Sequence, residues 1–274
     1  SDTYVFSKGD GQDLIYDDSI AVDQDVIRFT DVASTEITLA YKDGSLIINY
    51  GEGDSIEMSN FTSNSSTNYW IEQFEFTDQT LTLEQLIGMH AIEGSALKDH
   101  FSALSKLDAN MTFNGGAGDD ALSFSNLTKS VIVDGGAGND AITGGSGNDT
   151  LIGGNGADRI EGGLGSDLII GGTENDTLRG GRGSDTYVFS KGDGQDLIYD
   201  EGVAADQDVI RFTDVASTEI TLAYKDGSLI ISYGEGDSIE MSNFTSNSSI
   251  NYWIEQFEFT DQTLTLEQLV GMHA

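Results

Sequence analysis

The clearest hydrophobic pattern lies in the middle of the chain, where one large apolar residue recurs every nine residues. From Gly135 to Val188 these residues are Ile142, Leu151, Ile160, Ile169, Leu178 and Tyr187. Glycine and polar residues fill the intervals. An apolar position in a run too short for a helix, bounded by glycines, is typical of a short strand. The stretch therefore predicts six consecutive strand-and-turn units.

Glycine and aspartate follow the same period. Units of the form G-G-x-G-x-D-x-U-x, where U is large and apolar, begin at Gly135, Gly144, Gly153, Gly162, Gly171 and Gly180, and an outlying unit begins at Gly115. The sixth position is always aspartate: Asp120, Asp140, Asp149, Asp158, Asp167, Asp176 and Asp185. The fifth position varies. The sixth position therefore carries an obligatory carboxylate.

This pattern predicts calcium sites. Glycine adopts positive φ without steric cost and lets backbones approach closely, so several carbonyl oxygens can face one point. Calcium takes 6–8 oxygen ligands. A flexible linker would not keep glycine, aspartate and apolar residues in phase. Besides the seven aspartates, the candidate ligands are Gly136, Gly138, Gly145, Gly147, Gly154, Gly156, Gly163, Gly165, Gly172, Gly181 and Gly183.

Two nine-residue units are expected to complete one coil, so units two apart should stack. This stacking would pair Asp140 with Asp158, Asp149 with Asp167, Asp158 with Asp176, and Asp167 with Asp185, with calcium between the members of each pair.

The two ends of the chain are near copies: residues 1–91 recur at 184–274 with seven differences. Lys191–Tyr199 keeps the nonapeptide pattern with one glycine lost, which makes Asp196 a candidate ligand. Its twin is Asp13, and Asp2 is the twin of Asp185. Asp25 and Asp208 are fainter echoes of the pattern, interpreted as structural turns.

The copies also contain strand-forming runs. Glu36–Tyr41 and Leu46–Tyr50 flank an Asp-Gly turn, which predicts a hairpin. Asp54–Phe61 and Trp70–Phe76 are expected to extend its sheet, and Thr80–Leu86 to end in a short helical turn.

The connector at 92–114 shows a different spacing. Leu97, Phe101 and Leu104 fall at i, i+4 and i+7, which predicts one apolar face of a short helix over Ser95–Leu107.

Composition adds a strong acidic bias: 47 Asp and Glu against 12 Lys and Arg give a net charge of −35. A compact fold with this charge repels itself unless cations neutralise it; the alternative is a disordered or halophilic acidic surface. Nucleic acid is a poor partner, because binding phosphate needs clustered Lys and Arg. The chain has no cysteine, so calcium would replace disulfides as the stabilising link. It has no apolar run long enough to span a membrane and opens inside the repeat pattern, so we expect a piece of a longer protein.

The nonapeptides resemble those of the RTX (repeats-in-toxin) family of secreted Gram-negative bacterial proteins. The resemblance implies a right-handed parallel β-roll, export by a type I system, and a chain that stays unfolded until it meets extracellular calcium. One departure is Glu174, at a fourth position normally occupied by glycine, so we expect a distorted turn there.

The end copies resemble the haemolysin-type calcium-binding-related module that accompanies RTX repeats. The matching segments in the first copy are Asp2–Phe6, Gly9–Asp13, Gly53–Ile56 and Ile71–Phe76. Thr77–Thr80 departs from the usual Asp-Gly-Thr of that module.

The predicted fold is thus all-β: a β-roll between two β-rich modules. The expected divisions are 1–91 for the first copy, 92–114 for a helical connector, 115–188 for the β-roll, and 184–274 for the second copy.

No catalytic motif accompanies the histidines His90, His100 and His273, so we expect no enzyme. The predicted function is a calcium-binding structural and secretion module of a large secreted adhesin or toxin, at the bacterial surface or outside the cell, beside neighbouring repeats. Two alternatives stay open. The chain could be the carrier of a secreted protease or lipase, or it could bind a cell-surface glycan or protein through aromatic pairs such as Tyr69-Trp70 and Tyr252-Trp253.

Overall fold

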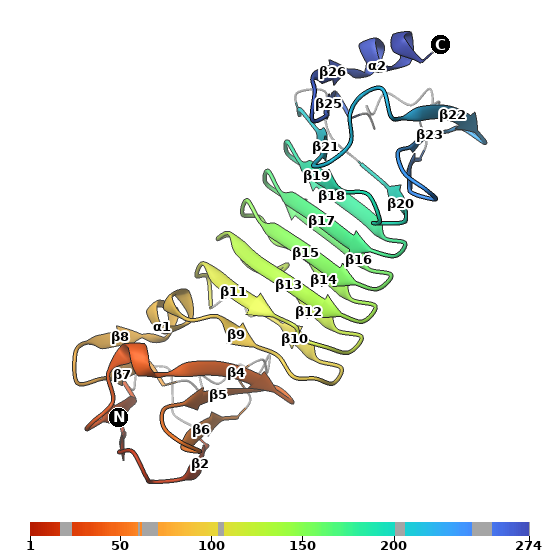
Figure 1. Cartoon of the computed structure of the whole chain (residues 1–274). Helices are drawn as coiled ribbons and strands as arrows, with labels where there is room; N and C mark the ends of the chain where they lie inside the picture. The colour runs from red at the N-terminus through yellow and green to blue at the C-terminus, as the bar shows by residue number, and fades with distance from the viewer. Residues whose placement is uncertain are drawn as a thin grey trace.

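The computed structural model describes residues 1–16, 24–59, 61, 71–103, 107–200, 206–242 and 254–273. In these ranges the chain forms an elongated roll of strands, with the first copy at one end and the second copy at the other (Figure 1). The aromatic pairs proposed for glycan binding lie outside the described residues. None of the helices in these ranges is long or apolar enough to cross a membrane.

Two parallel sheets build the middle of the roll, and successive strands alternate between them. One contains β9 (Ile92–Glu93), β11 (Met111–Asn114), β13 (Val131–Ala137), β15 (Thr150–Asn155), β17 (Leu168–Thr173) and β19 (Thr186–Phe189). The other contains β10 (His100–Ser102), β12 (Ala121–Ser123), β14 (Ala141–Thr143), β16 (Arg159–Leu164), β18 (Thr177–Arg182) and β20 (Gln195–Ile198).

The strand register confirms that two nonapeptides make one coil. Leu151 pairs with Ile169 in one sheet, and Ile160 pairs with Leu178 in the other. The apolar residues of the eighth position are all buried, with Leu151 at 0% exposure. They fill the space between the sheets, so the nine-residue apolar period is the core of the roll.

The second copy continues both sheets without a break. β21 (Val209–Phe212), β25 (Gln256–Glu258) and β26 (Thr263–Thr265) extend the sheet of β19, and β24 (Ser238–Met241), β23 (Ser228–Ser232) and β22 (Thr221–Lys225) extend the sheet of β20. Helix α2 (Leu266–Met272) comes next. The nonapeptides and this copy therefore share one pair of sheets.

The first copy has the same strands. β1 (Thr3–Phe6), β3 (Val26–Phe29), β7 (Gln73–Glu75) and β8 (Thr80–Thr82) form a sheet of their own, with α1 (Leu83–Met89) directly after β8. β2 (Gln12–Ile15), β6 (Ser55–Met58), β5 (Ser45–Asn49) and β4 (Thr38–Lys42) join the roll because β4 pairs with β9. A 3-10 turn, η1, covers Ser34–Glu36.

Two local predictions in the copies are confirmed. β4 and β5 form an antiparallel hairpin, and its turn residues Asp43 and Gly44 have φ of 50° and 86°, the conformation that an Asp-Gly turn favours. The expected helical turn is α1, which starts after a capping box of Thr82 and Gln85.

The predicted connector helix is wrong. Residues 100–102 form β10, which pairs in parallel with β12. Leu97 is 76% exposed whereas Phe101 is 1% exposed, so the two do not share an apolar face; Leu104 lies outside the described residues. Phe101 packs against Phe113 and Phe124, with ring centroids 4.6 and 5.2 Å away. Strand pairing and this aromatic core outweigh the helical spacing.

Candidate metal centre

The sixth-position aspartates stand above one another in two columns along the roll. The first column is Asp99, Asp120, Asp140, Asp158, Asp176 and Asp196, and the second is Asp149, Asp167, Asp185 and Asp208. In each column the backbone amide of one aspartate donates to Oδ1 of the aspartate in the next coil, over 2.7–2.9 Å. The stacking of all four predicted pairs is confirmed.

The second carboxylate oxygen is the informative one. Among the described residues, Oδ2 is buried and has no hydrogen-bond partner in Asp120, Asp140, Asp158, Asp167, Asp176, Asp185 and Asp196, which are at most 3% exposed. Asp149 and Asp99 differ, because their Oδ2 atoms accept from the Gly145 and Ser95 amides. A buried carboxylate oxygen without a donor is costly, so its repetition at seven levels indicates a cation ligand.

Backbone oxygens converge on the same spaces. A methyl group added to Gly153 would lie 2.2 Å from Asp158 Oδ2 and 2.4 Å from the Gly171 carbonyl oxygen. At Gly162 the same two groups are Asp167 Oδ2 at 2.3 Å and the Gly180 carbonyl at 2.6 Å. These two first-position glycines thus leave room beside one carboxylate and one carbonyl oxygen, the hard ligands that calcium prefers.

The glycines at the second and fourth positions bring the coils together. Gly154 and Gly156 have φ of 112° and 126°, and a Cβ on either would lie about 2 Å from a carbonyl of the preceding coil, at 2.1 and 2.0 Å. Gly145 and Gly147 differ from the other predicted glycines, since neither has a left-handed φ. They stack on the irregular segment at Leu127–Ser130 rather than on another nonapeptide.

Burial shifts the acidity of the columns. It raises the pKa of Asp158, Asp167 and Asp185 to about 7, despite the backbone amide that stabilises each carboxylate. For Asp196, at the end of the first column, burial raises the pKa to about 8. Proteins counter such desolvation by protonation or by a bound cation. The donor set, composed only of oxygen, fits calcium.

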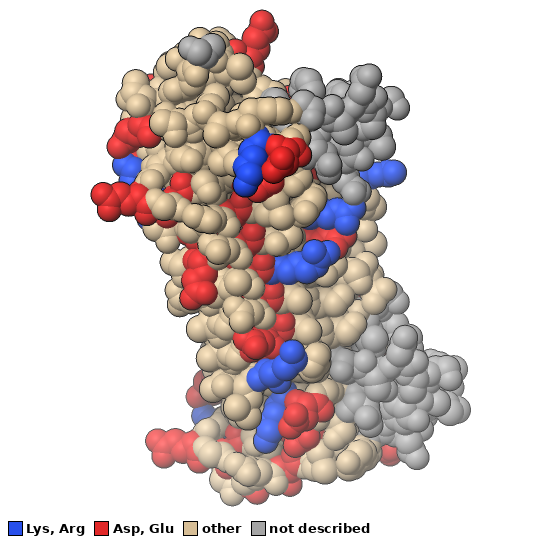
Figure 2. All heavy atoms as spheres, turned by 90° about the vertical axis from the view of Figure 1, so that its right-hand side faces the viewer, with Lys and Arg blue, Asp and Glu red and all other residues tan. Residues whose placement is uncertain are grey.

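Charged side chains at the surface, unlike the buried aspartates of the columns, lie beside side chains of opposite charge. Acidic side chains run along one face of the roll with Lys and Arg beside them (Figure 2). Arg159 and Arg179 lie 3.8 and 3.5 Å from Glu161. Such exposed pairs contribute little to stability, so the distinctive chemistry lies in the buried columns.

The comparisons with known proteins agree with this geometry. Residues 134–169 and 161–196 match the RTX calcium-binding nonapeptide repeat (4 copies). Residues 134–196 are RTX repeats. Residues 46–81 and 229–264 match the haemolysin-type calcium binding protein related domain, and RTX repeats of this type bind several calcium ions.

Individual proteins similar to this chain cover it less evenly. Iron-regulated protein FrpA of Neisseria meningitidis serogroup C is 33% identical over 125 residues, which is 43% of this chain and 11% of that protein. The chain thus spans about a tenth of that relative. The crystal structure of extracellular lipase LipA from Serratia marcescens aligns with 92% of this chain and 38% of its own, at 17% identity and a TM-score of 0.23.

The candidate ligands outside the regular RTX repeats differ in their position relative to the columns. Asp120 is no outlier, because it stacks between Asp99 and Asp140. In the first copy, the exposed Asp2 donates its amide to Asp25 Oδ1 at 2.6 Å, and Asp13 is half-buried.

The sequence pattern missed Asp99 and gave Asp208 no ligand role. Gly94–Ser102 has aspartate in the sixth position and Phe101 in the eighth, but only its first glycine. Asp208 comes 23 residues after Asp185 instead of 18, so a strict period does not reach it. A search that allowed lost glycines and inserted loops would have found both.

The sequence predicts a distorted turn at Glu174, but the structure keeps the turn of the other units there. Glu174 adopts the glycine-like conformation with φ of 83°. Asp176, two residues later, is 2% exposed and accepts from the Asp158 amide at 2.8 Å. The cost of the conformation is local, and the column passes through this RTX unit unchanged.

Proposed function

We propose that this chain is a calcium-binding structural and secretion module of a larger secreted RTX protein, an adhesin or toxin, which folds when it meets extracellular calcium. The observation that carries the proposal is the unpartnered Oδ2 atom repeated along both aspartate columns. The chemistry proposed for the module is binding and folding, with no catalytic step.

The proposed ligands are the column carboxylates with the carbonyls of the intervening glycine turns. In the first column ions would lie between Asp140 and Asp158 and between Asp158 and Asp176. In the second they would lie between Asp149 and Asp167 and between Asp167 and Asp185. Asp120 and Asp196 extend the first column, and Asp2 and Asp13 would bind calcium in the first copy.

The magnitudes favour coupling of calcium binding to folding. Extracellular calcium modules bind with Kd of about 10⁻⁴–10⁻³ M, and at ten times Kd one site stabilises the fold by roughly 1.4 kcal/mol. Four such sites contribute roughly 6 kcal/mol, comparable with the whole stability of a domain. At the low calcium of a cytoplasm this stabilisation disappears, while the repulsion among 47 acidic residues remains.

A calcium titration followed by far-ultraviolet circular dichroism tests the proposal. In EGTA the chain should lack its β signal, and millimolar calcium should restore it cooperatively; magnesium at the same ionic strength is the control. A full β signal in EGTA would refute calcium-dependent folding.

The two copies also suggest what lies beside this module in a longer protein. Tyr41 of the first copy is 3% exposed, whereas its twin Tyr224 is 54% exposed; Ile87 is 1% exposed and its counterpart Val270 42%. The segment directly after the first copy causes this difference in exposure, because it covers Tyr41 and Ile87. In that segment β9 pairs with β4, and the Tyr41 ring packs 5.1 Å from that of Phe101.

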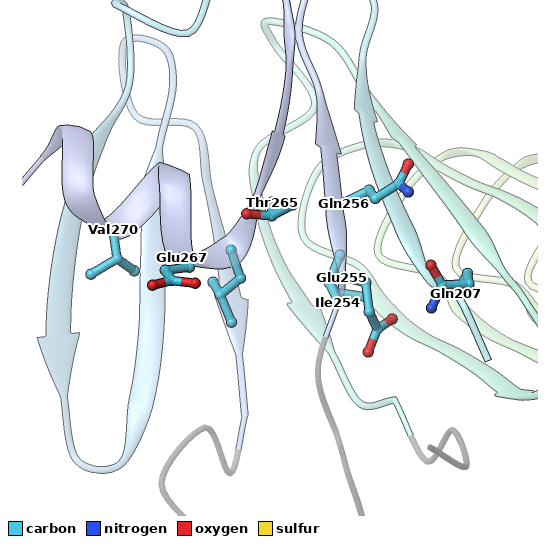
Figure 3. A pocket seen from close by; sticks show the side chains of 8 residues that line it. Gln207, Ile254, Glu255, Gln256, Thr265, Glu267 and Val270 are labelled. Carbon is cyan, nitrogen blue, oxygen red and sulfur yellow. The ribbon is translucent and has the colours of Figure 1, made fainter. Parts of the chain in front are cut away.

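On the second copy the corresponding surface is open. Among the described residues β22 is the last strand of its sheet. Val270 and Glu267 of α2 line a pocket together with Glu255 and Gln207 (Figure 3). We propose that this surface receives another RTX block of the kind formed by residues 92–183, so that modules and blocks alternate.

An extended chain tests this arrangement. A second copy of residues 92–183 fused after Ala274 should slow amide hydrogen exchange in β22 to the rate seen in β4. The 274-residue chain is the matched control. Unchanged exchange in β22 of a fusion that folds with calcium would refute the docking of a further block.

A further inference from the structure

Three carboxylates gather where the nonapeptides meet the second copy. Asp185, Asp200 and Asp208 have oxygen atoms that all lie within 4.8 Å of one another. Their exposures are 0%, 5% and 2%. Asp185 ends the regular repeats, Asp200 comes after β20, and Asp208 precedes β21. Asp200 belongs to neither column, so the nonapeptide pattern does not account for this cluster.

One oxygen of the cluster, Asp185 Oδ2, is buried and has no donor in the part of the chain that the structure describes. Asp185 Oδ1 accepts from the Asp167 amide, and Asp208 Oδ1 accepts from the Asp185 amide, both at 2.8 Å. Asp200 Oδ2 accepts from the Tyr187 hydroxyl at 2.9 Å. Asp185 Oδ2 is fully buried and unpartnered.

That oxygen faces the same space as the tyrosine that holds Asp200. A methyl group added to Gly180 would lie 2.2 Å from Asp185 Oδ2 and 2.7 Å from the Tyr187 hydroxyl oxygen. The hydroxyl also accepts from the Gly180 amide at 2.6 Å. Tyr187 stands where the other units have leucine or isoleucine. Its phenol therefore fixes Asp200 beside the last first-position glycine.

The C-terminal end of the second column differs from the preceding coils. At Gly162 the space beside the carboxylate is bounded by the carbonyl of the glycine in the next coil, Gly180. At Gly180 itself the nonapeptide pattern has ended, and the Tyr187 hydroxyl is the neighbouring oxygen instead. Asp200 thus adds a third carboxylate at the level where the next glycine turn is missing.

We infer that Asp185, Asp200 and Asp208 form a further divalent-cation site that closes the second column. Three buried carboxylates carry enough charge for a divalent ion and strongly repel one another without it. Carboxylate and phenol oxygens, with neither sulfur nor nitrogen among the clustered groups, select hard cations. Calcium fits better than magnesium, because magnesium dehydrates reluctantly and requires near-octahedral geometry.

The inference rests on the proposed calcium-dependent fold, and the test separates the two. Asp200→Asn removes one charge but keeps an oxygen that can accept from the Tyr187 hydroxyl. The matched control is Asp226→Asn, at an exposed hairpin position with φ of 52° that asparagine tolerates. Native mass spectrometry of the calcium-loaded full chain counts the ions in each variant.

We expect Asp200→Asn to hold one calcium fewer than the wild type and Asp226→Asn to hold the same number. Equal numbers in all three proteins would overturn the site, whereas a wild type without calcium would instead overturn the proposed function. Asp208→Asn, which also keeps an oxygen for its amide partner, is the second variant.

Urea denaturation in saturating calcium gives a second readout with a definite sign. If an ion binds here, Asp200→Asn removes one of the negative charges that hold it, and the midpoint falls below that of Asp226→Asn. If none binds, removing one of three clustered carboxylates relieves repulsion, and the midpoint rises. A raised or unchanged midpoint would contradict the site.

Discussion

The backbone amide of Asp140 donates to Oδ1 of Asp158, one coil away, at 2.7 Å, while Asp158 Oδ2 has no donor among the described residues. One carboxylate in this arrangement has two separable tasks. Oδ1 caps an amide of the neighbouring coil, and Oδ2 remains for a cation.

Substitutions at Asp158 should separate these tasks. Asp158→Asn keeps an acceptor for the Asp140 amide and removes the charge, so we expect a higher calcium midpoint for folding. Asp158→Ala also leaves that amide without its partner, which costs about 1–3 kcal/mol more. Circular dichroism titrations measure both effects, with Asp226→Asn as the control.

Asp120→Ala should behave like Asp158→Ala, because Asp120 stacks in the same column. A calcium midpoint for Asp120→Ala equal to that of the wild type would contradict the continuity of the column through residues 99–140.

The stability of the calcium-free fold should depend on pH. Burial raises the pKa of Asp158, Asp167 and Asp185 to about 7, above the value near 4 of an unfolded chain. The metal-free fold therefore binds more protons than the unfolded chain across this window. Its stability is greatest below about pH 4 and falls as the pH rises through about 7.

After calcium has been removed on a chelating resin, we expect some β structure at about pH 5 and less at about pH 8, where the calcium-free chain should be unfolded. With calcium the trend reverses, since protons compete for the carboxylates, and the calcium midpoint should rise on acidification. Circular dichroism at both pH values checks this. Identical calcium midpoints at the two pH values would argue against the column carboxylates as ligands.

Glu174 should be a site of local strain. Its φ of 83° lies in the left-handed region, which costs a non-glycine residue about 1–2 kcal/mol. Glycine has a greater loss of chain entropy, about 0.5–1 kcal/mol. We expect Glu174→Gly to raise the free energy of unfolding by about 0.5–1 kcal/mol in urea with calcium present.

The matched variant Glu174→Gln removes the charge and keeps the strain. If it stabilises the chain as much as Glu174→Gly does, relief of charge repulsion and not of backbone strain would be the cause.

The connector offers a test of its strand structure. Phe101 is buried among aromatic rings, so Phe101→Ala should destabilise the chain by about 3–5 kcal/mol. Leu97 is 76% exposed, and Leu97→Ala should change stability by less than about 0.5 kcal/mol. A helix with both residues on its buried face would give two large effects, which urea denaturation would detect.

Much of the centre could be predicted from the sequence because its geometry repeats. The period of nine sets both the apolar core and the stacking of Asp140 on Asp158, and neither depends on distant parts of the chain. Asp208 was not predicted as a ligand because it follows Asp185 by 23 residues and not by 18. The role of Asp200 depends on a tyrosine hydroxyl that only the three-dimensional structure places beside it.

The helix predicted in the connector was wrong for a different reason. Leu97 and Phe101 satisfy a helical spacing locally, but β12 and the rings of Phe113 and Phe124 determine the outcome. The contacts that determine this strand come from other segments of the chain, so the connector sequence alone does not predict it.

The hydrogen bonds along the two aspartate columns all point the same way: the amide belongs to the earlier coil and the carboxylate to the later one. Each column therefore has a polarity. Shortening it from the C-terminal side removes an acceptor and leaves an aspartate amide uncapped at the new end. Shortening it from the N-terminal side removes only a donor. The two ends of each column thus differ: a new C-terminal end leaves one aspartate amide without its carboxylate acceptor, and a new N-terminal end does not.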